Sequence, residues 1–406
     1  MECRVLVIGD PHYKINNGHD TLGMEKAIIE VVEAQRYDFI VVLGDILDRH
    51  ELAHVSPHKR ATDFLHALST RVRTFVLIGN HDLKNNKQFL SDEHFFVAHK
   101  YWNSQITIID KPHSEVIKGH TFVFLPYVPS GRFFTALRLL HSDDKCLQVL
   151  GALETEDKKT PEELLAAAPW MILPSHIPER NWAQLWVEKH KDRRLDLGAD
   201  TLLDSKSEWM GATCIWAHQE FKGAQMGSQI STDGDIWPLD YPQVISGHIH
   251  DFQIVQSNVM YIGTPIQHTF SDAADKIISE FLFEENKKYI HNPITLNVSR
   301  KRILHITCAE VGTTVLEPNI DYKIKIQGLA AELKAVNKHP NVKLWKSQGH
   351  KIQLRDVPLT DTKSEVKNGQ TFQVVPGRFS TSLYNRIKGD PKLALCYTNL
   401  FQNTMS

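Results

Sequence analysis

The chain of 406 residues has few cysteines, and they follow none of the patterns that cross-link a chain or bind zinc. The five are Cys3, Cys146, Cys214, Cys308 and Cys396. Their number is odd, they lie far apart, and no two have CxxC spacing. This arrangement disfavours a disulfide framework and a zinc ribbon, and it favours a reducing compartment.

Long apolar runs are also absent from the sequence. No uncharged apolar stretch approaches the roughly 18 residues that a membrane span requires. The N-terminus, MECRVLVIGD, leads directly into a strand pattern and has no signal-peptide pattern. We therefore expect an intracellular protein, cytoplasmic or nuclear, with no membrane partner.

The chain has almost no net charge, −2 at pH 7, but its charges are unevenly distributed. Residues 1–286 contain 27 Lys and Arg against 40 Asp and Glu, a net of −13. Residues 287–406 contain 19 against 8, a net of +11. This basic segment favours an anionic partner such as nucleic acid. Charge alone leaves two other interpretations open: a solvated basic surface, or a segment that complements the acidic remainder of the chain.

Strand-like and helix-like patterns alternate from residue 4 to residue 80. The apolar runs are RVLVIGD, DFIVVLGD and TFVLIGN, and the amphipathic stretches MEKAIIEVVEAQR and HKRATDFLHALSTRV lie between them. This is a βαβαβ order. Each strand ends in Gly-Asp or Gly-Asn, and the functional groups of open α/β sheets collect at such carboxyl ends.

Further strand patterns continue to about residue 283, with one interruption. Residues 129–212 favour helices, which predicts a helical insertion between two halves of a site. Short strand-like pieces over 287–375 predict a basic α+β domain, and residues 376–406, rich in Asn, Thr and Ser, predict a tail. The predicted organisation is a main domain over 1–286, a smaller domain over 287–375 and a tail.

Five short segments carry groups suited to chemistry, and each lies where a strand pattern breaks. They are GDPHY (9–13), GDILDR (44–49), GNHD (79–82), AHQEF (217–221) and GHIHD (247–251). Together they supply carboxylates, imidazoles and an amide oxygen but no thiolate, a set that suits Mn, Fe, Zn or Mg ions. Two cations about 4 Å apart require a shared carboxylate and about three further ligands each. The five segments contain that number of groups.

Each segment alone is a weak indication of a metal site. A Gly-Asp at a strand end is more often a turn, a His-x-His is more often a surface pair, and GNHD is compatible with a turn and a helix cap. All five occur together, in order, each after a strand. That joint occurrence favours a metal site over the ordinary interpretations.

The order GDxH, GDxxDR, GNHD, a single His and GHxH resembles the calcineurin-like metallophosphoesterases over about residues 1–285, apart from the insertion. The resemblance implies an α/β fold, a two-sheet sandwich flanked by helices, with the helical insertion and a small C-terminal α+β capping domain. It also implies two divalent metal ions over the strand ends. One ion would lie among Asp10, His12, Asp45 and His250, and the other among Asp45, Asn80, His218 and His248, with Asp45 as the bridge.

Three residues beside these ligands are assigned roles in catalysis. His81 matches the family's histidine that contacts the substrate phosphate and helps protonate the leaving oxygen. Asp82 is expected to orient the other ring nitrogen of His81. For Arg49 two interpretations stay open: contact with a non-bridging phosphate oxygen, or a salt bridge to Asp48. The attacking group would be a hydroxide that two cations generate near neutral pH.

Two flanking segments resemble one branch of the family, the SbcD-type DNA repair exonucleases. These are YIGTPIQHTFSD (261–272) and FLPYVPSGRF (124–133). Phosphoprotein phosphatases, by contrast, carry GDxVDRG and GNHE, which differ from GDILDRH and GNHD in this chain. The resemblance implies a manganese-dependent exo- or endodeoxyribonuclease of DNA repair, recombination or processing. It also implies a capping domain that contacts DNA and an SMC-like ATPase partner.

Other functions are compatible with the same groups. A phosphatase or a small nucleotide phosphodiesterase would use the same seven ligands, and Mg, Fe or Zn could replace manganese. A noncatalytic scaffold is a third, less favoured interpretation, and a homodimer stays open.

Two positions depart from the nuclease branch. Lys14 stands where that branch often has Gly, two residues after the first ligand histidine. Asp48 stands where some of its members have His, three residues after the bridging Asp. The first departure bears on the approach to the metals, and the second leaves the balance of exonuclease and endonuclease activity open.

Overall fold

The computed structural model describes residues 1–50, 52, 54–85, 89–137, 140, 208–227, 229–285 and 289–356. Met1–Arg355 form one compact unit. Most of the predicted helical insertion, the end of the predicted α+β domain (residues 357–375) and the predicted tail lie outside the described residues.

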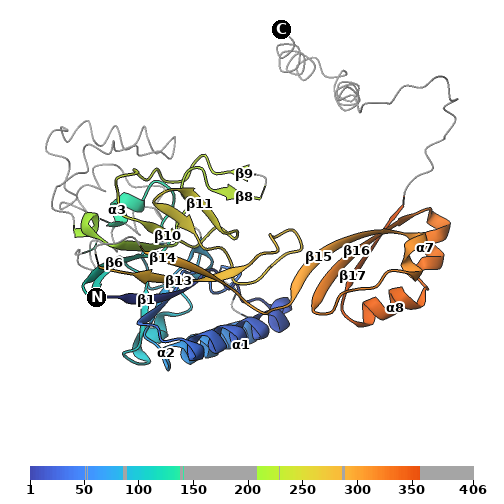
Figure 1. Ribbon diagram of the computed structural model, residues 1–406, viewed down its shortest axis with the longest axis horizontal. Coiled ribbons are helices and arrows are strands. Elements are labelled where there is room, and N and C mark those ends of the chain that lie inside the picture. The colour runs from blue at the N-terminus through green and yellow to red at the C-terminus, as the bar shows by residue number, and fades with distance from the viewer. Residues whose placement is uncertain are drawn as a thin grey trace, which may run out of the picture. The chain divides into compact units, whose positions relative to one another are not determined.

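A six-stranded sheet carries the N-terminal half of the site (Figure 1). In spatial order its strands are β14 (Ile290–Thr295), β13 (Ile277–Phe283), β1 (Cys3–Ile8), β2 (Phe39–Val42), β3 (Thr74–Leu77) and β4 (Ile106–Ile109). Strands β1 to β4 are parallel, whereas β13 is antiparallel to both β1 and β14. The parallel strands place the segments that follow β1, β2 and β3 at one edge of the sheet.

Alternate side chains of this sheet enter two different cores. Leu6 and Ile8 pack towards helices α1 (Gly18–Ala34) and α2 (Val55–Ser69). Val5 and Val7 pack in the other direction, against residues of a second sheet. Because strands buried on both faces need apolar residues at every position, they read as continuous apolar runs in the sequence.

The second sheet also has six strands. In spatial order they are β11 (Gln253–Gln256), β12 (Val259–Tyr261), β10 (Val244–Ser246), β7 (Cys214–Ala217), β6 (His120–Leu125) and β5 (His113–Ile117). The core between the sheets is rich in aromatic residues, including Phe39, Phe75, Phe124 and Trp216. The outer face packs under α3 (Phe133–Leu137) and the rings of Trp209 and Trp237. The predicted two-sheet α/β sandwich flanked by helices is confirmed.

Short elements complete this part of the chain. They are the 3-10 helices η1 (Ile15–Asn17), η2 (Asn80–Asp82), η3 (Val97–Tyr101) and η5 (Glu208–Gly211), and the two-stranded sheet of β8 (Gln225–Met226) and β9 (Gln229–Ile230). In the part of the chain that the structure describes, no helix has the length and apolar character needed to cross a bilayer.

Residues 300–356 form a C-terminal module of strands β15 (Arg300–Thr307), β16 (Ile320–Gly328) and β17 (Lys351–Asp356). Its helices are η6 (Cys308–Gly312), α7 (Ala330–Val336) and α8 (Pro340–Ser347). Apolar side chains such as Ile306, Ile324 and Trp345 form its core. The predicted α+β character of this segment is therefore observed.

The predicted boundary after residue 286 precedes one strand of the main domain. β14 follows that point in the chain, yet it pairs with β13 at the edge of the first sheet. The domain boundaries themselves stay a prediction.

Candidate metal centre

Asp10, His12 and His250 converge where the ends of β1 and β10 meet. Each offers one ligand atom, and these atoms lie within 4.8 Å of one another. Nε2 of His12 is 3.0 Å from Nε2 of His250. Two imidazole lone pairs cannot face each other at this distance unless a proton or a metal ion lies between them.

Asp45, His218 and His248 form a second group of this kind. The Nδ1–H of His218 donates to the carbonyl of Leu43 over 2.7 Å, because a carbonyl can only accept. Nε2 of His218 is therefore the atom that lies 3.1 Å from Asn80 Oδ1 and 3.3 Å from Asp45 Oδ2. Nδ1 of His248 is 3.0 Å from the same Asn80 oxygen. These converging acceptors suit a cation.

The two groups are buried and rich in negative charge. Asp10 and Asp45 are almost inaccessible to solvent, and burial raises the pKa of Asp10 well above its usual value. Burial alone would lower the pKa of His218, but the carboxylates of Asp45 and Asp10 raise it to about 9. Among the described residues, Asp10 Oδ1 and His12 Nδ1 have no hydrogen-bond partner. A site that attracts a proton this strongly fits divalent cations, and it offers them oxygen and nitrogen ligands.

Three of the converging residues have strained backbones. The φ angles of His12, Asp45 and His248 are 45°, 46° and 79°, in a region that non-glycine residues rarely occupy. Such strain persists only where the surrounding structure imposes it, and it clusters at functional sites. Here it turns three side chains towards one place.

Two motif glycines are required by close packing at the site. A Cβ on Gly79 would lie 2.3 Å from both the backbone nitrogen and Oδ1 of Asp45. A Cβ on Gly247 would lie 2.4 Å from Asp10 Oδ1. The glycines of GNHD and GHIHD therefore make room for the two carboxylates.

His81 lies beside both groups and keeps one ring nitrogen available. Its backbone N–H donates to Asp45 Oδ1 over 2.8 Å. Its ring Nδ1 is 2.8 Å from the carbonyl oxygen of Asp48, so Nδ1 carries the proton and Nε2 is the atom left for chemistry. Its ring centroid is 5.2 Å from that of His12. His81 can therefore reach a group that is bound at the centre.

The contact predicted between Asp82 and the ring of His81 is wrong. The carboxylate of Asp82 accepts instead from the backbone N–H groups of Leu47 and Gly79, each over 3.0 Å. The 3-10 turn η2 aims this side chain back into the loops rather than towards its neighbour's ring. Asp82 therefore holds the two ligand-bearing loops in register.

Arg49 is exposed at the edge of the site. The alternative of a salt bridge to Asp48 is not observed, because that carboxylate pairs with Lys14, with 3.2 Å between Nζ and Oδ1. Within the described ranges Arg49 has no ion pair, so its guanidinium is available to an anion.

A match to a known protein family covers the same five segments. The profile of the family described as calcineurin-like phosphoesterase matches residues 3–252. This stretch contains all seven predicted metal ligands and the loops that carry them. The chain belongs to the calcineurin-like phosphoesterase family. It is therefore a phosphoester hydrolase of a family that uses divalent metals, and its structure has two groups of side chains suited to hold them.

Two viral proteins are similar to this chain over most of its length. "Putative phosphoesterase 078R" of Invertebrate iridescent virus 3 is 31% identical over 367 residues, which is 89% of this chain and 87% of the viral protein. "Putative phosphoesterase 244L" of Invertebrate iridescent virus 6 is 30% identical over 342 residues, 83% of this chain and 98% of that protein. Neither name specifies a substrate.

Sequence reasoning missed two residues next to the ligands. His268 is buried with its ring centroid 5.0 Å from that of His12, and Nε2 lies 3.3 Å from the carbonyl oxygen of Asp10. Lys276 is buried and donates to the carbonyl oxygen of His250 and to Asp251 Oδ1, each over 2.7 Å. His268 lies within YIGTPIQHTFSD (261–272), one of the two segments that resemble the SbcD-type branch. No local pattern signals Lys276, because its contact spans 26 residues.

Proposed function

We propose that this calcineurin-like phosphoesterase is a two-metal phosphodiester hydrolase of the SbcD type whose substrate is DNA. The observation that carries the proposal is the convergence of seven ligand candidates and His81 at one edge of the sandwich. One ion would be held by Asp10, His12, Asp45 and His250, and the other by Asp45, Asn80, His218 and His248. Manganese is the metal we propose, in the place of Mg, Fe or Zn.

The residues of the chain have separate tasks in the proposed reaction. When bound, two divalent cations supply a hydroxide near neutral pH and neutralise a phosphate oxygen. In its doubly protonated form His81 presents Nε2–H to the leaving oxygen and gives it that proton, while Nδ1–H stays bonded to the carbonyl of Asp48. The exposed guanidinium of Arg49 binds a non-bridging oxygen. These groups act on any phosphoester, so the substrate has to be inferred from elsewhere in the chain.

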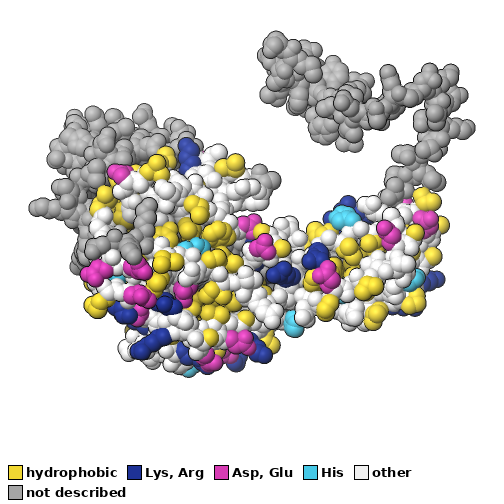
Figure 2. Space-filling view, in the orientation of Figure 1, with side chains coloured by type: hydrophobic (Ala, Val, Ile, Leu, Met, Phe, Trp, Pro, Cys, Tyr) yellow, Lys and Arg dark blue, Asp and Glu magenta, His cyan; other side chains and the backbone are white. Residues whose placement is uncertain are grey.

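The C-terminal module supports DNA over a small phosphoester. Residues 300–356 contain 11 Lys and Arg against 5 Asp and Glu. Figure 2 shows Lys and Arg side chains on this module, which Figure 1 labels β15 to α8. Nonspecific binding to DNA depends on such positive charge near phosphates and needs no sequence motif.

One face of the module's sheet concentrates this charge. Ile324 and Ile326 of β16 point into the core with α7 and α8, so Lys323 and Lys325, which alternate with them, lie on the opposite face. Alternation in β15 and β17 places further basic side chains there. The basic side chains of this open face are His305, Lys323, Lys325, Lys351 and Arg355, and Ile303 and Asp321 lie on it as well.

The test is hydrolysis by the purified full chain with Mn²⁺. The substrates are end-labelled single- and double-stranded DNA, p-nitrophenyl phosphate and its bis ester. His81→Ala serves as the inactive variant, and His66→Ala, which changes an exposed histidine on α2, serves as the matched control. DNA degradation that is lost only in His81→Ala supports the proposal. Turnover of the small esters alone would contradict the nuclease and favour a phosphatase or a small-molecule phosphodiesterase. If no substrate is turned over while metal is bound, a noncatalytic scaffold is favoured.

The open face has its own test. Lys323→Met with Lys325→Met should weaken DNA binding and reduce its dependence on salt by about two phosphate contacts. Lys338→Met with Lys343→Met, a change of equal charge at exposed positions after α7 and on α8, should have little effect. Equal losses for the two pairs would contradict a role for this face. The proposed SMC-like ATPase partner is tested separately, by co-purification with the full chain.

A further inference from the structure

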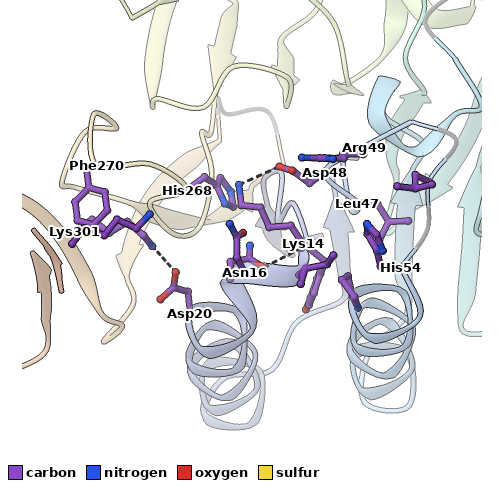
Figure 3. A pocket seen from close by; sticks show the side chains of 16 residues that line it. Lys14, Asn16, Asp20, Leu47, Asp48, Arg49, His54, His268, Phe270 and Lys301 are labelled. Atoms are coloured by element: carbon purple, nitrogen blue, oxygen red, sulfur yellow. Dashed lines mark hydrogen bonds and ion pairs between the residues drawn. The ribbon is translucent and has the colours of Figure 1, made fainter. Parts of the chain in front are cut away.

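A cavity of about 540 Å³ opens directly beside the candidate metal centre. Its wall includes Tyr13 and Lys14, which follow His12, and Asp48 and Arg49, which follow the loop of Asp45 (Figure 3). Ligand pockets in proteins have volumes of roughly 300–1,000 Å³. A phosphoester with its phosphorus at the centre would extend one of its two substituents into this space.

More basic than acidic side chains line the cavity. Lys14, Arg49, Lys301 and Lys351 line it, against the carboxylates of Asp20 and Asp48. Two of the four cations are already paired, Lys14 with Asp48 and Lys301 with Asp20 (Figure 3). Lys301 is also a fixed structural group, because its Nζ donates to the carbonyl of Gln267 over 2.8 Å. Two positive charges, on Arg49 and Lys351, are therefore available to an anionic ligand.

Part of the cavity wall is aromatic and apolar as well as basic. The ammonium of Lys351 lies over the ring of Phe270, with Nζ 5.3 Å from the ring centroid. Leu52 and Ile15 also line the cavity, and they are 55% and 65% exposed. Exposed aliphatic side chains and a partly exposed ring suit a ligand with a flat apolar surface better than they suit a bare phosphate.

The inner end of the cavity reaches the ligand groups through His268. This side chain is 9% exposed, lines the cavity, and lies with its ring centroid 5.0 Å from that of His12. Its Nδ1 is buried and has no hydrogen-bond partner in the described part of the chain. A buried polar atom of this kind normally has a partner, and a polar group of a ligand in the cavity would supply one.

We propose that this cavity is a nucleotide subsite, which holds the nucleoside next to the scissile phosphate with its base on Phe270 and its outer phosphate on Lys351. The inference rests on the proposed function, since it names the part of a nucleic-acid substrate that the site would bind. It assigns Phe270 and Lys351 to substrate binding rather than to the metal centre.

The test compares the binding of three probes by the full chain: 5′-dAMP, deoxyribose 5-phosphate and inorganic phosphate. Calorimetric titrations are made with Mn²⁺ and again with EDTA. We expect 5′-dAMP to bind about 10-fold more tightly than deoxyribose 5-phosphate, because only the first carries a base that can stack. Phe270→Ala should remove that difference and leave the affinity for inorganic phosphate unchanged.

Matched variants separate the subsite from general effects. Tyr101→Ala removes an exposed ring elsewhere and should change nothing, whereas Phe270→Leu, which keeps apolar volume, should bind like Phe270→Ala. Lys351→Met should weaken the binding of deoxyadenosine 3′,5′-bisphosphate, which carries an outer phosphate, several-fold, and Lys343→Met should not. Equal affinity of the chain for 5′-dAMP and deoxyribose 5-phosphate, or a preference for 5′-dAMP that survives both Phe270 variants, would overturn the subsite.

The subsite and the nuclease proposal can fail separately. If the chain does not cleave DNA but binds 5′-dAMP through Phe270, the subsite stands and the substrate is a smaller nucleotide. If the chain cleaves DNA while the Phe270 variants keep wild-type affinities, the nuclease stands and the subsite is refuted.

Discussion

The side chains of Lys14 and Asp48 form an ion pair, with 3.2 Å between Nζ and Oδ1. Both positions depart from the residues, Gly and His, that the resemblance to the SbcD-type branch leads us to expect. The same Asp48 oxygen lies 4.0 Å from Nδ1 of His12, whose Nε2 faces His250. The pair thus connects the wall of the cavity to a candidate metal ligand.

This connection predicts opposite effects of the two residues on metal affinity. A carboxylate that accepts a hydrogen bond from the outer nitrogen of a metal-bound histidine typically contributes 10- to 100-fold in metal affinity. Nδ1 of His12 has no hydrogen-bond partner among the described residues, so Asp48 acts on it at 4.0 Å through charge alone, and Asp48→Asn should weaken Mn²⁺ binding by less than 10-fold. Lys14→Met should not weaken it, since the carboxylate loses a competing partner. Titration of both variants with Mn²⁺ measures the two affinities, and equal losses of Mn²⁺ affinity would contradict the prediction.

His81 should affect the chemical step without affecting metal binding. Its ring contacts the carbonyl of Asp48 and faces His12, but it belongs to neither ligand group. Loss of a general acid typically costs 10²- to 10⁴-fold in rate. We expect His81→Ala to lower kcat by about that factor with an unchanged metal content, measured by elemental analysis. A loss of bound metal in the variant would instead make His81 a part of the metal centre.

The seven ligand candidates could be predicted because each follows an apolar strand within a short motif. Asp10 and His12 share a strand end, and so do His248 and His250. The packing of β1 against the second sheet brings the two pairs together. His12 and His250 are 238 residues apart in the chain. Spacing along the sequence contains no such information, and the resemblance to a family supplied it.

The features that were missed depend on contacts between distant segments. Asp82 was expected beside its neighbour's ring, but its carboxylate reaches the N–H of Leu47, 35 residues away. β5, His113–Ile117, has a polar and half-exposed sequence and forms only as the partner of β6 at the sheet edge. β14 contains His291 and Pro293 and likewise owes its place to pairing with β13. Edge strands tolerate such residues, so their sequences lack a strong strand pattern.

Lys276 should stabilise the loop that carries His250. Its side chain is only 4% exposed, and its ammonium donates to the carbonyl of His250 and to Asp251. Lys276→Met should lower the free energy of unfolding by about 1–3 kcal/mol, the typical cost of leaving buried polar groups unpaired. It should also weaken Mn²⁺ binding. Urea unfolding and metal titration test both effects, with the exposed Lys222→Met as control. A variant with wild-type stability would contradict the role.

Metal binding should stabilise the folded chain measurably. Divalent cations would contact the buried carboxylates of Asp10 and Asp45 only in the folded chain, and a ligand that binds only the folded state stabilises it by about 2.7 kcal/mol at 100 times its Kd. We expect Mn²⁺ to raise Tm and EDTA to lower it. Asp45→Asn, which weakens both groups, should lose most of the metal-dependent shift. Scanning calorimetry with and without EDTA would reveal an unchanged Tm if the groups do not bind metal.

Asp235 should make stability depend on pH without touching the metal ligands. Its carboxylate accepts from the N–H of Gly131 over 3.1 Å and from Nε2 of Gln219 over 2.7 Å, and burial raises its pKa to about 7. A pKa raised in the folded state means that the stabilisation is complete below the unfolded value of about 4 and is lost as pH rises through 7. The free energy of unfolding should therefore fall between pH 5 and pH 8 by on the order of 2 kcal/mol relative to Asp235→Asn.

The variant can keep both hydrogen bonds of Asp235, which makes the comparison informative. The Oδ1 of an asparagine would accept from Gly131, and its amide would donate to Gln219 once that side chain turns over. The turn is favourable because Oε1 of Gln219 is buried without a partner among the described residues. Urea unfolding in EDTA, which excludes metal effects, measures the difference, and Asp240→Asn at an exposed position is the control. Parallel pH profiles of wild type and Asp235→Asn would show that Asp235 is ionised in the folded chain, because only a proton held by the carboxyl up to pH 7 separates the two curves.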